Sequence, residues 1–227
     1  MTGPLYLERQ RRSSKNWLVH RIHDAALEAR LREHARGCLV DIGCGDKPYA
    51  PLAAPYVDRH IGLDHPGSGH GRGQVDLFAL AYDTALAPDS IDTVLCTFVL
   101  EHLEDPARAL AEMRRILKPG GTLILSAPQS WHVHEAPRDF YRYTRYGLQH
   151  LMEDAGLRVV EVTPLAGFAV TFLQEAVYVL ERRGHGILRL PFAVLRRGFQ
   201  RLGWMLHRWD RSYEFTWAYL AVAKKDA

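Results

Sequence analysis

The chain contains three segments in which apolar residues recur every three or four positions, the spacing of an amphipathic helix. They cover residues 16–36, 106–117 and 144–155. Gly37 and Gly156 end the first and third of these patterns, and Pro106 suits the first turn of the second. The sequence therefore predicts three helices at these places.

Short, continuous apolar runs lie between and beyond these helical segments. They cover residues 38–42, 60–63, 74–77, 91–98, 122–126, 157–162 and 215–223. Runs of this length, bounded by glycine, proline or acidic residues, are typical of buried strands. Because helical segments separate several of the runs, the pattern predicts an α/β fold with a parallel sheet and helical crossovers.

A helical insertion, residues 167–211, separates the last two predicted strands. Within it, residues 187–209 mix Leu, Phe, Trp and Met with five arginines and predict a basic amphipathic helix. Three interpretations remain open for its apolar face. It covers the acceptor pocket as a lid, it forms a homodimer contact, or it lies on an anionic membrane surface.

Composition limits the number of domains and the kinds of partner. With 227 residues, 47% of them hydrophobic, the chain has the size of one α/β domain with additions. Its parts are an N-terminal helical region (1–36), a cofactor-binding core (37–166), the insertion (167–211) and the last strand (212–227). A net charge of +3 gives no reason to expect a nucleic-acid partner.

The three cysteines and the remaining sequence patterns indicate a reducing compartment. Cys38, Cys44 and Cys96 are odd in number, form no CxxC pair and lie in apolar runs, so we expect them to be reduced and buried. The first residues lack the pattern of a secretory leader, and no apolar run is long enough to cross a bilayer. We therefore predict a cytoplasmic protein, with peripheral membrane contact through 187–209 as one interpretation.

The first strand ends in a glycine loop that is typical of cofactor binding, Asp41-Ile42-Gly43-Cys44-Gly45. Glycines let the chain turn tightly and leave the backbone open to a ligand. The dinucleotide fingerprint requires a further glycine where this chain has Pro48, which disfavours a pyrophosphate. Asp41 could accept hydrogen bonds from an ammonium and Asp64 from ribose hydroxyls. Asp64 would serve an NAD ribose equally well.

Five segments in order resemble the class I S-adenosylmethionine-dependent methyltransferases. They are Leu-Val-Asp-Ile-Gly-Cys-Gly at 39–45, Ile-Gly-Leu-Asp at 61–64, Val-Asp-Leu at 75–77, Ile-Asp-Thr-Val-Leu-Cys-Thr-Phe-Val-Leu-Glu-His-Leu at 91–103 and Leu-Lys-Pro-Gly-Gly-Thr-Leu at 117–123. Each segment alone is a weak signal. Together they identify the chain as similar to this family from about residue 37 to 162.

The resemblance implies a Rossmann-like sheet of seven strands, of which only the last is antiparallel, and S-adenosylmethionine as cofactor. It also implies the residues of the cofactor site. Gly43 and Gly45 would lie against the methionine part, Asp64 would hold the ribose hydroxyls, Asp76 and Leu77 would meet the adenine, and Thr97 with Phe98 would line the pocket near the methionine.

The Glu101-His102 pair has two interpretations, the start of the turn before Pro106 or a role at the acceptor site. In one branch of the family a similar Glu-His pair belongs to a magnesium site, together with a second Glu one helical turn earlier. Here that position is Phe98. The resemblance therefore predicts no metal.

Residues 127–144 follow the fifth predicted strand, on the side where open parallel sheets bind ligands. His132 and His134 are candidates for a general base, because imidazole titrates near neutral pH. Trp131, Tyr141 and Tyr143 are candidates for orienting the acceptor. A structural role is the alternative, in which Asp139 pairs with Arg142 and Thr144 caps the following helix.

The sequence thus predicts an S-adenosylmethionine-dependent methyltransferase that acts on a small molecule, such as a natural product, or on a glycan or lipid-linked acceptor. Oxygen is the favoured acceptor atom because histidines are available as bases. After the fourth strand the chain lacks the Asn-Pro-Pro-Tyr pattern of enzymes that methylate amino groups of nucleic-acid bases. An NAD(P)-dependent oxidoreductase and a membrane-surface protein with a non-catalytic cofactor pocket are the alternatives.

Overall fold

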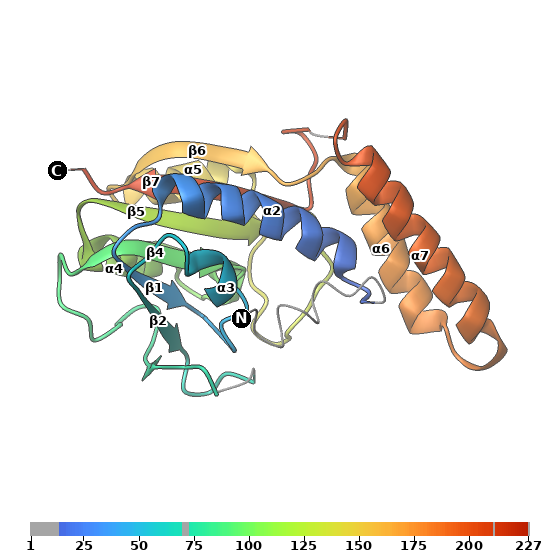
Figure 1. Ribbon diagram of the computed structural model, residues 1–227, viewed down its shortest axis with the longest axis horizontal. Helices are drawn as coiled ribbons and strands as arrows, with labels where there is room; N and C mark the ends of the chain where they lie inside the picture. Colours follow the sequence, from blue (N-terminus) through green and yellow to red (C-terminus); the bar gives the residue numbers. More distant parts are fainter. Residues whose placement is uncertain (1–13, 70–72, 211, 227) are drawn as a thin grey trace.

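A seven-stranded sheet forms the centre of the computed structural model, which describes residues 14–69, 73–210 and 212–226 (Figure 1). Along the sheet the strands follow the order β3-β2-β1-β4-β5-β7-β6. Their bounds are β1 (Cys38–Ile42), β2 (Arg59–Asp64), β3 (Leu77–Phe78), β4 (Ile91–Thr97), β5 (Leu117–Pro128), β6 (Arg158–Pro164) and β7 (Ala218–Lys224).

Strand direction confirms the predicted topology. β1 pairs in parallel with β2 and β4, so that Asp41 lies opposite Gly62 and Leu95. β7 lies between β5 and β6 and runs antiparallel to both. Because β1, β2 and β4 are parallel, their carboxyl ends meet at one edge of the sheet. The glycine loop, Asp64 and Thr97 are thereby brought together.

Helices cover both faces of the sheet. Their bounds are α2 (Trp17–His34), α3 (Ala50–Ala53), α4 (Pro106–Ile116), α5 (Arg145–Asp154), α6 (Phe168–Arg183) and α7 (Arg189–Leu206), with 3-10 turns η1 (Leu100–His102) and η2 (Gly186–Leu188). The three predicted helices correspond to α2, α4 and α5. As predicted, the Thr144 hydroxyl caps α5 by accepting from the Gly147 N–H at 3.1 Å.

Two apolar cores lie on opposite faces of the sheet, and the alternation along the strands assigns residues to each. Val40 and Val94 pack in the core under α4 and α5, whereas Leu39 and Leu95 pack in the core under α2. All four side chains are fully buried. Both faces of the central strands are covered, which explains why their sequences are continuous apolar runs rather than alternating ones.

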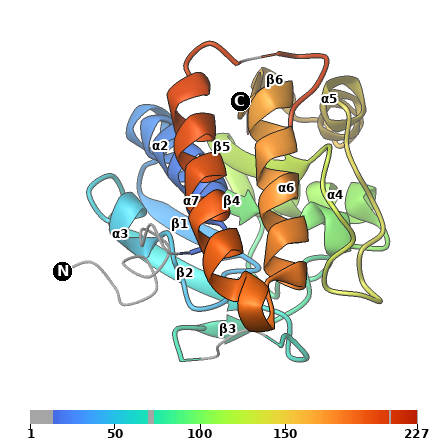
Figure 2. The same cartoon turned by 90° about the vertical axis from the view of Figure 1, so that its right-hand side faces the viewer.

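The predicted insertion is a hairpin of two helices, α6 and α7, which stands beyond the arrowheads of β5 and β6 (Figures 1 and 2). The Gln200 side chain on α7 donates hydrogen bonds to the backbone carbonyls of Ser14 and Lys15, just before α2. A Cβ on Gly203 would lie 2.5 Å from Leu18 Cδ2, so α7 packs closely on α2. In the part of the chain that the structure describes, no helix has both the length and the apolar content to cross a membrane.

Candidate functional site

The glycine loop after β1 is folded tightly against the end of β2. Gly43 has a φ of 73°, and a Cβ at this position would lie 2.3 Å from Val99 Cγ2. The N–H groups of Gly43 and Cys44 donate to the Leu63 carbonyl. The Gly45 N–H donates to Asp64 Oδ2 at 2.8 Å. Glycine is therefore required at 43 by both the backbone conformation and the lack of space.

Asp41, in β1 just before this loop, is a buried carboxyl that lines a cavity. It is 1% exposed, and among the described residues neither of its oxygens has a hydrogen-bond partner. The imidazole Nε2 of His60 lies 3.4 Å from Asp41 Oδ2. Burial raises the pKa of Asp41. Buried acceptors are rarely left unsatisfied, so a bound ligand with N–H donors would complete this site.

Two adjacent cavities open at the carboxyl edge of the sheet. The larger has a volume of about 580 Å³ and the smaller about 290 Å³, and both are lined by Gly43 and His102. The predicted cofactor residues divide between them. Those lining the larger cavity are Asp41, Gly43, Gly45, Thr97 and Phe98. Asp64 lines the smaller one with Leu80 and Tyr82.

Asp76 and Leu77, predicted to meet an adenine, do not line either cavity. Asp76 accepts a hydrogen bond from the Gly62 N–H at 2.7 Å and pairs with the Lys47 ammonium. Although partial burial opposes it, these partners lower the pKa of Asp76. Leu77 pairs with Leu63 in the sheet. Contact of these two residues with an adenine remains a prediction.

The segment after β5 is fixed by a bidentate ion pair. Arg142 Nη1 and Nη2 donate to the two oxygens of Asp139 at 2.7 and 2.8 Å, which confirms the predicted pairing. Arg142 also donates to the His132 carbonyl, and Asp139 accepts from the His134 N–H at 2.9 Å. These hydrogen bonds hold the pKa of Asp139 well below its usual range. The Asp139–Arg142 ion pair thus fixes the backbone conformation at His132 and His134.

His132 and His134 both line the larger cavity, as expected for an acceptor site. His134 Nδ1 lies 3.2 Å from the His132 carbonyl oxygen. A carbonyl can only accept, so Nδ1 carries the proton and Nε2 is the basic nitrogen. Burial lowers the pKa of His134. The ring is therefore neutral at neutral pH and able to take up a proton.

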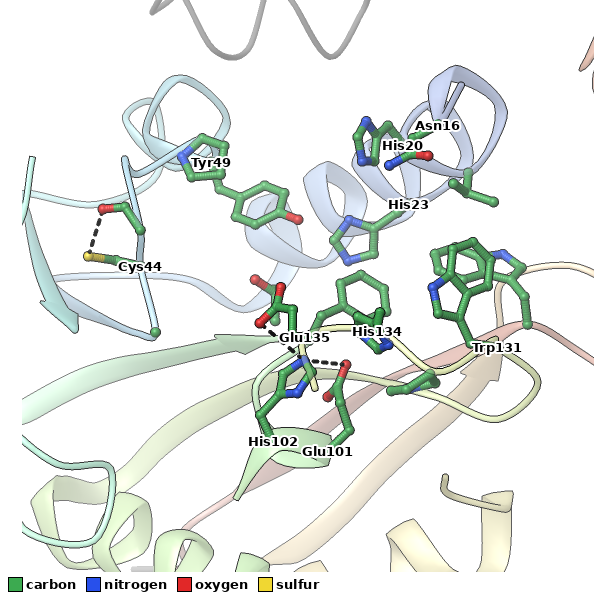
Figure 3. Close-up of a pocket in the computed structure, with 18 of the residues that line it drawn as sticks. Asn16, His20, His23, Cys44, Tyr49, Glu101, His102, Trp131, His134 and Glu135 are labelled. Atoms are coloured by element: carbon green, nitrogen blue, oxygen red, sulfur yellow. Dashed lines mark hydrogen bonds and ion pairs between the residues drawn. The ribbon is translucent and has the colours of Figure 1, made fainter. Parts of the chain in front are cut away.

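Glu101 is a site residue for which the sequence left two interpretations open. Its side chain is fully buried yet lines the larger cavity, and among the described residues its oxygens have no hydrogen-bond partner. Burial raises the pKa of Glu101 to about 8. The imidazole Nε2 of His102 lies 3.9 Å from Glu101 Oε1 and 3.7 Å from Glu135 Oε2 (Figure 3). The carboxyl is thus protonated at neutral pH.

Glu101, His102 and His134 are also the residues that could hold a metal ion. Each offers one ligand atom, and the three atoms lie within 4.8 Å of one another. A carboxylate with two imidazoles is a donor set that suits zinc or another transition metal. The expectation that the protein works without a metal remains a prediction.

An aromatic wall closes the larger cavity on the side of the helical hairpin. The Trp131 ring lies 5.3 Å from those of Tyr178 and Trp217, and Trp217 stacks on Phe98 at 5.4 Å. Trp131 is therefore where an acceptor-binding residue is expected. Tyr178 comes from α6, so the insertion forms part of the cavity wall.

Tyr141 and Tyr143 lie outside both cavities. The Tyr143 hydroxyl donates to the Leu100 carbonyl at 2.9 Å, and its side chain is buried in the core. The Tyr141 hydroxyl donates to the Glu104 carbonyl at 3.0 Å. Their predicted role in orienting the acceptor is not supported by this arrangement, in which both hydroxyls hold the turn around η1.

Residues at the start of α2 line the same cavity and were not singled out from the sequence. Asn16, His20 and His23 point into it (Figure 3). His23 Nε2 lies 2.7 Å from the Ser126 hydroxyl, and Asn16 Oδ1 accepts from the Tyr178 hydroxyl at 2.7 Å. These residues come from a helix more than a hundred positions away from their partners. No local motif could have indicated them.

Comparison with known proteins decides which cofactor the chain uses. The family model for a methyltransferase domain matches residues 8–162, more than half of the chain. The chain belongs to the class I S-adenosylmethionine-dependent methyltransferases. S-adenosylmethionine is its cofactor, as predicted. The match favours this donor over the nicotinamide cofactor of the alternative interpretation.

Two relatives of this chain are named as methyltransferases. A probable S-adenosylmethionine-dependent methyltransferase of Mycolicibacterium smegmatis is 28% identical over 156 residues, which cover 66% of this chain and 59% of that protein. The O-methyltransferase cnsE of Penicillium expansum is 30% identical over 149 residues, covering 56% of this chain and 54% of that one. The chain thus spans little more than half the length of these two relatives.

A solved structure confirms the predicted fold. Phosphoethanolamine N-methyltransferase 2 of Haemonchus contortus, in complex with S-adenosylmethionine, superposes with a TM-score of 0.57 at 18% identity. The match covers 90% of this chain and 52% of that one. At this identity the likeness concerns the arrangement of strands and helices.

The residues of this methyltransferase fit the cofactor. S-adenosylmethionine has no phosphate, and it carries an ammonium and two ribose hydroxyls. The buried carboxyl of Asp41 lines one cavity and the carboxyl of Asp64 lines the other. Gly43 lines both, where a side chain would collide with Val99. The two carboxyl groups and the space at Gly43 therefore fit the cofactor of this family.

Proposed function

We propose that this methyltransferase methylates a hydroxyl oxygen of a small molecule, such as a natural product, or of a glycan or lipid-linked acceptor, with His134 as the general base. The observation that carries the proposal is the 3.2 Å distance from His134 Nδ1 to the His132 carbonyl oxygen, from which the tautomer of His134 follows. Its Nδ1 donates to the His132 carbonyl, and its pKa is lowered by burial. A neutral imidazole at the cavity, with Nε2 as its basic nitrogen, is the form that can accept a hydroxyl proton.

The chemistry balances with the groups of this chain. Asp41 and Asp64 would hold S-adenosylmethionine, which would supply the methyl group to the acceptor oxygen, its sulfur keeping the electron pair of the broken bond. The hydroxyl proton goes to Nε2 of His134. The remaining contribution of the protein is alignment, because an in-line displacement depends on the geometry of the reacting atoms. The Asp139–Arg142 pair acts there as a positioning element for His134.

His132 is the second candidate base. Its Nδ1 lies 3.3 Å from Glu175 Oε1 on α6. The carboxylate would hold the proton on Nδ1 and leave Nε2 basic. The ring packs on Trp131 and Tyr178, with ring centroids 5.2 and 4.3 Å away. His132 thus belongs to the aromatic wall, and we assign it a larger part in holding the acceptor than in taking its proton.

We assign the two parts of the cofactor to the two cavities. Asp64 would accept hydrogen bonds from the ribose hydroxyls in the smaller cavity, and Asp41 would accept from the ammonium in the larger. Ala79 and Leu80 line the smaller cavity directly after β3 and would contact the adenine. Asp76, predicted for that contact, would instead stabilise the end of β2 and the glycine loop through its contacts with the Gly62 N–H and Lys47.

The choice of oxygen is supported by the base and by one relative. The name of the Penicillium expansum relative is that of an O-methyltransferase. An amine acceptor would make a different demand on the site, since a neutral amine needs no base before it attacks. A buried imidazole in its neutral form is most useful for a hydroxyl.

The proposal is tested by methyl transfer from methyl-labelled S-adenosylmethionine into metabolite and lipid extracts of Mycolicibacterium smegmatis, followed by mass spectrometry of the labelled product. We expect an O-methyl product. His134→Gln should lower the rate about 100-fold or more, the usual contribution of a general base, while the affinity for the cofactor stays unchanged. His150→Ala, an exposed histidine on α5, is the matched control.

Three results would contradict the proposal. Label found on nitrogen or carbon of the product would exclude oxygen as the acceptor atom. Parallel losses of rate and cofactor affinity in His134→Gln would assign that histidine a structural role. A larger rate loss in His132→Ala than in His134→Gln would move the base to His132.

A further inference from the structure

Helix α7 carries a line of apolar side chains on its solvent side. They recur every three or four positions, which places them on one face of a helix. The outer stripe consists of Leu190, Val194, Leu202 and Met205 on α7, together with Ile187 in the preceding turn η2 and Trp209 just after α7. Gly198 lies between Val194 and Leu202. Exposed fractions are 93% for Ile187, 75% for Leu190, 66% for Met205 and 80% for Trp209.

The other side of α7 makes the contacts with the body of the protein. Gln200 is 3% exposed, and Gly203 packs against Leu18. Trp204 lies 5.9 Å from Trp17 on α2, measured between ring centroids. The inward positions are thus already occupied, while the side chains of the outer stripe are exposed. Figure 2 shows α7 in front of the sheet, on the outside of the molecule. An apolar face of this size on the outside of a protein marks an interaction surface.

Arginines border the outer stripe. Arg197 and Arg201 are exposed and, four positions apart, lie on the same side of α7, and Arg208 is exposed in the turn that follows the helix. Residues 187–209 contain five arginines and no acidic residue. Two acidic residues of α6 are engaged nearby, since Glu181 pairs with Arg196 and Glu175 lies beside His132.

We propose that the outer stripe and its arginine flank dock this protein on an anionic membrane surface. A helix with an apolar face and an adjacent basic flank lies in the plane of the interface, with the apolar side chains among the acyl chains and the cations at the headgroups. A second copy of the chain complements this surface poorly, because 187–209 offers no carboxylate to the arginines of its partner.

The docking surface is tied to the cavity by the hairpin itself. Asp210, just after α7, accepts from the Val170 N–H at the start of α6 at 2.7 Å. α6 places Tyr178 in the cavity wall, and Gln174 on the same helix donates to the Lys15 carbonyl at 2.9 Å. The same hairpin thus carries both the outer stripe and part of the cavity wall.

Co-sedimentation with vesicles tests the proposal on the full chain. The probes are vesicles of phosphatidylcholine alone and of phosphatidylcholine with 30% phosphatidylglycerol. We expect the protein to pellet with the anionic vesicles and to remain in the supernatant with the neutral ones, with binding that weakens as salt is raised. The measurement needs neither cofactor nor acceptor, so its result is independent of the proposed methylation.

Two variants separate the apolar and the charged parts of the surface. Leu190→Ser with Met205→Ser should lower vesicle binding at least tenfold at every salt concentration. Arg197→Gln with Arg201→Gln should lower it mainly at low salt. Tyr146→Ser, which changes a 75% exposed aromatic on α5, is the matched control and should bind like the wild type. Thermal unfolding verifies that each variant is folded.

The proposal is overturned if the wild type does not pellet with anionic vesicles, or if the serine variant pellets as the wild type does. Sedimentation velocity supplies the other outcome. A dimer that the serine variant converts to monomer, without vesicle binding by the wild type, would assign the surface to a second copy of the chain.

Discussion

At the scale of single residues, Glu101 links stability to pH. Its pKa in the folded protein is about 8, whereas the ordinary value for a glutamate is 4.5. The folded state therefore holds the proton after the unfolded state has lost it. Between these two values the free energy of unfolding falls as pH rises, because the unfolded state binds fewer protons there. Below pH 4.5 the carboxyl is protonated in both states.

Replacing Glu101 with glutamine removes this pH dependence, because the amide resembles the protonated carboxyl and does not ionise. We expect the free energy of unfolding of the wild type to fall steadily, relative to that of Glu101→Gln, as pH rises from 4.5 to 8. Chemical denaturation of both proteins across this range measures it. Parallel curves would show that Glu101 is ionised in the folded protein.

Gly43 tests the geometry of the loop. Gly43→Ala places a methyl group 2.3 Å from Val99 Cγ2 and forces alanine to a φ of 73°. The left-handed conformation alone costs about 1–2 kcal/mol. We expect lower thermal stability and at least tenfold weaker binding of S-adenosylmethionine. The double variant with Val99→Ala should recover part of the stability, since it removes the collision but not the strain.

Gly69→Ala is the control for that substitution, because a Cβ at Gly69 meets no atom within 4 Å. Wild-type affinity and stability in Gly43→Ala would contradict the geometry of the loop given above.

From the sequence, cavity-lining residues at the ends of strands could be predicted more reliably than the contacts of residues in loops. Asp41 and Asp64 line the cavities because parallel strands end at one edge, which a pattern of strands already implies. The contacts of Asp76 were harder to predict, because its partner Lys47 has a φ of 49° in a turn. The sequence does not show which way such a turn directs the side chain. The orientations of Tyr141 and Tyr143 likewise depend on contacts with distant backbone carbonyls.

At the scale of the elements, the start of α6 depends on a residue from the far end of the hairpin. The N-cap residue of α6 is Gly167, which has no side chain to accept hydrogen bonds. Asp210 takes that role for the Val170 N–H. We expect Asp210→Ala to lower the free energy of unfolding by about 1 kcal/mol, as for the loss of a helix cap.

Asp210→Asn keeps an acceptor oxygen and should retain most of this stability. Chemical denaturation of the two variants compares them. Equal losses would show that the charge, rather than the hydrogen bond, holds the two ends of the hairpin together.

The periodicity of α7 predicted an amphipathic helix but not which face would turn outward. An apolar stripe usually faces the core. Here Gly203 permits close approach to Leu18, and Gln200 hydrogen-bonds the chain before α2, so a different face packs inward. α3 escaped prediction for another reason, since its four residues are too few to show a period.

At the scale of the whole molecule, the sheet topology sets two cavities side by side and places Gly43 and His102 between them. The family and the α/β fold could be predicted because five short segments keep their order along the chain. The shape of the acceptor side could not, because it is built from α2, α6 and the segment after β5, which lie far apart in the sequence.

Calorimetric titration of S-adenosylmethionine is the most direct test of this account. We expect the wild type to bind it and Asp64→Ala to bind it roughly 10- to 100-fold more weakly, since a hydrogen bond to a charged group contributes roughly 1.5 to 3 kcal/mol. Asp58→Ala, an exposed aspartate just before β2, should bind like the wild type. Equal affinities for all three proteins, or binding of NAD instead, would contradict it.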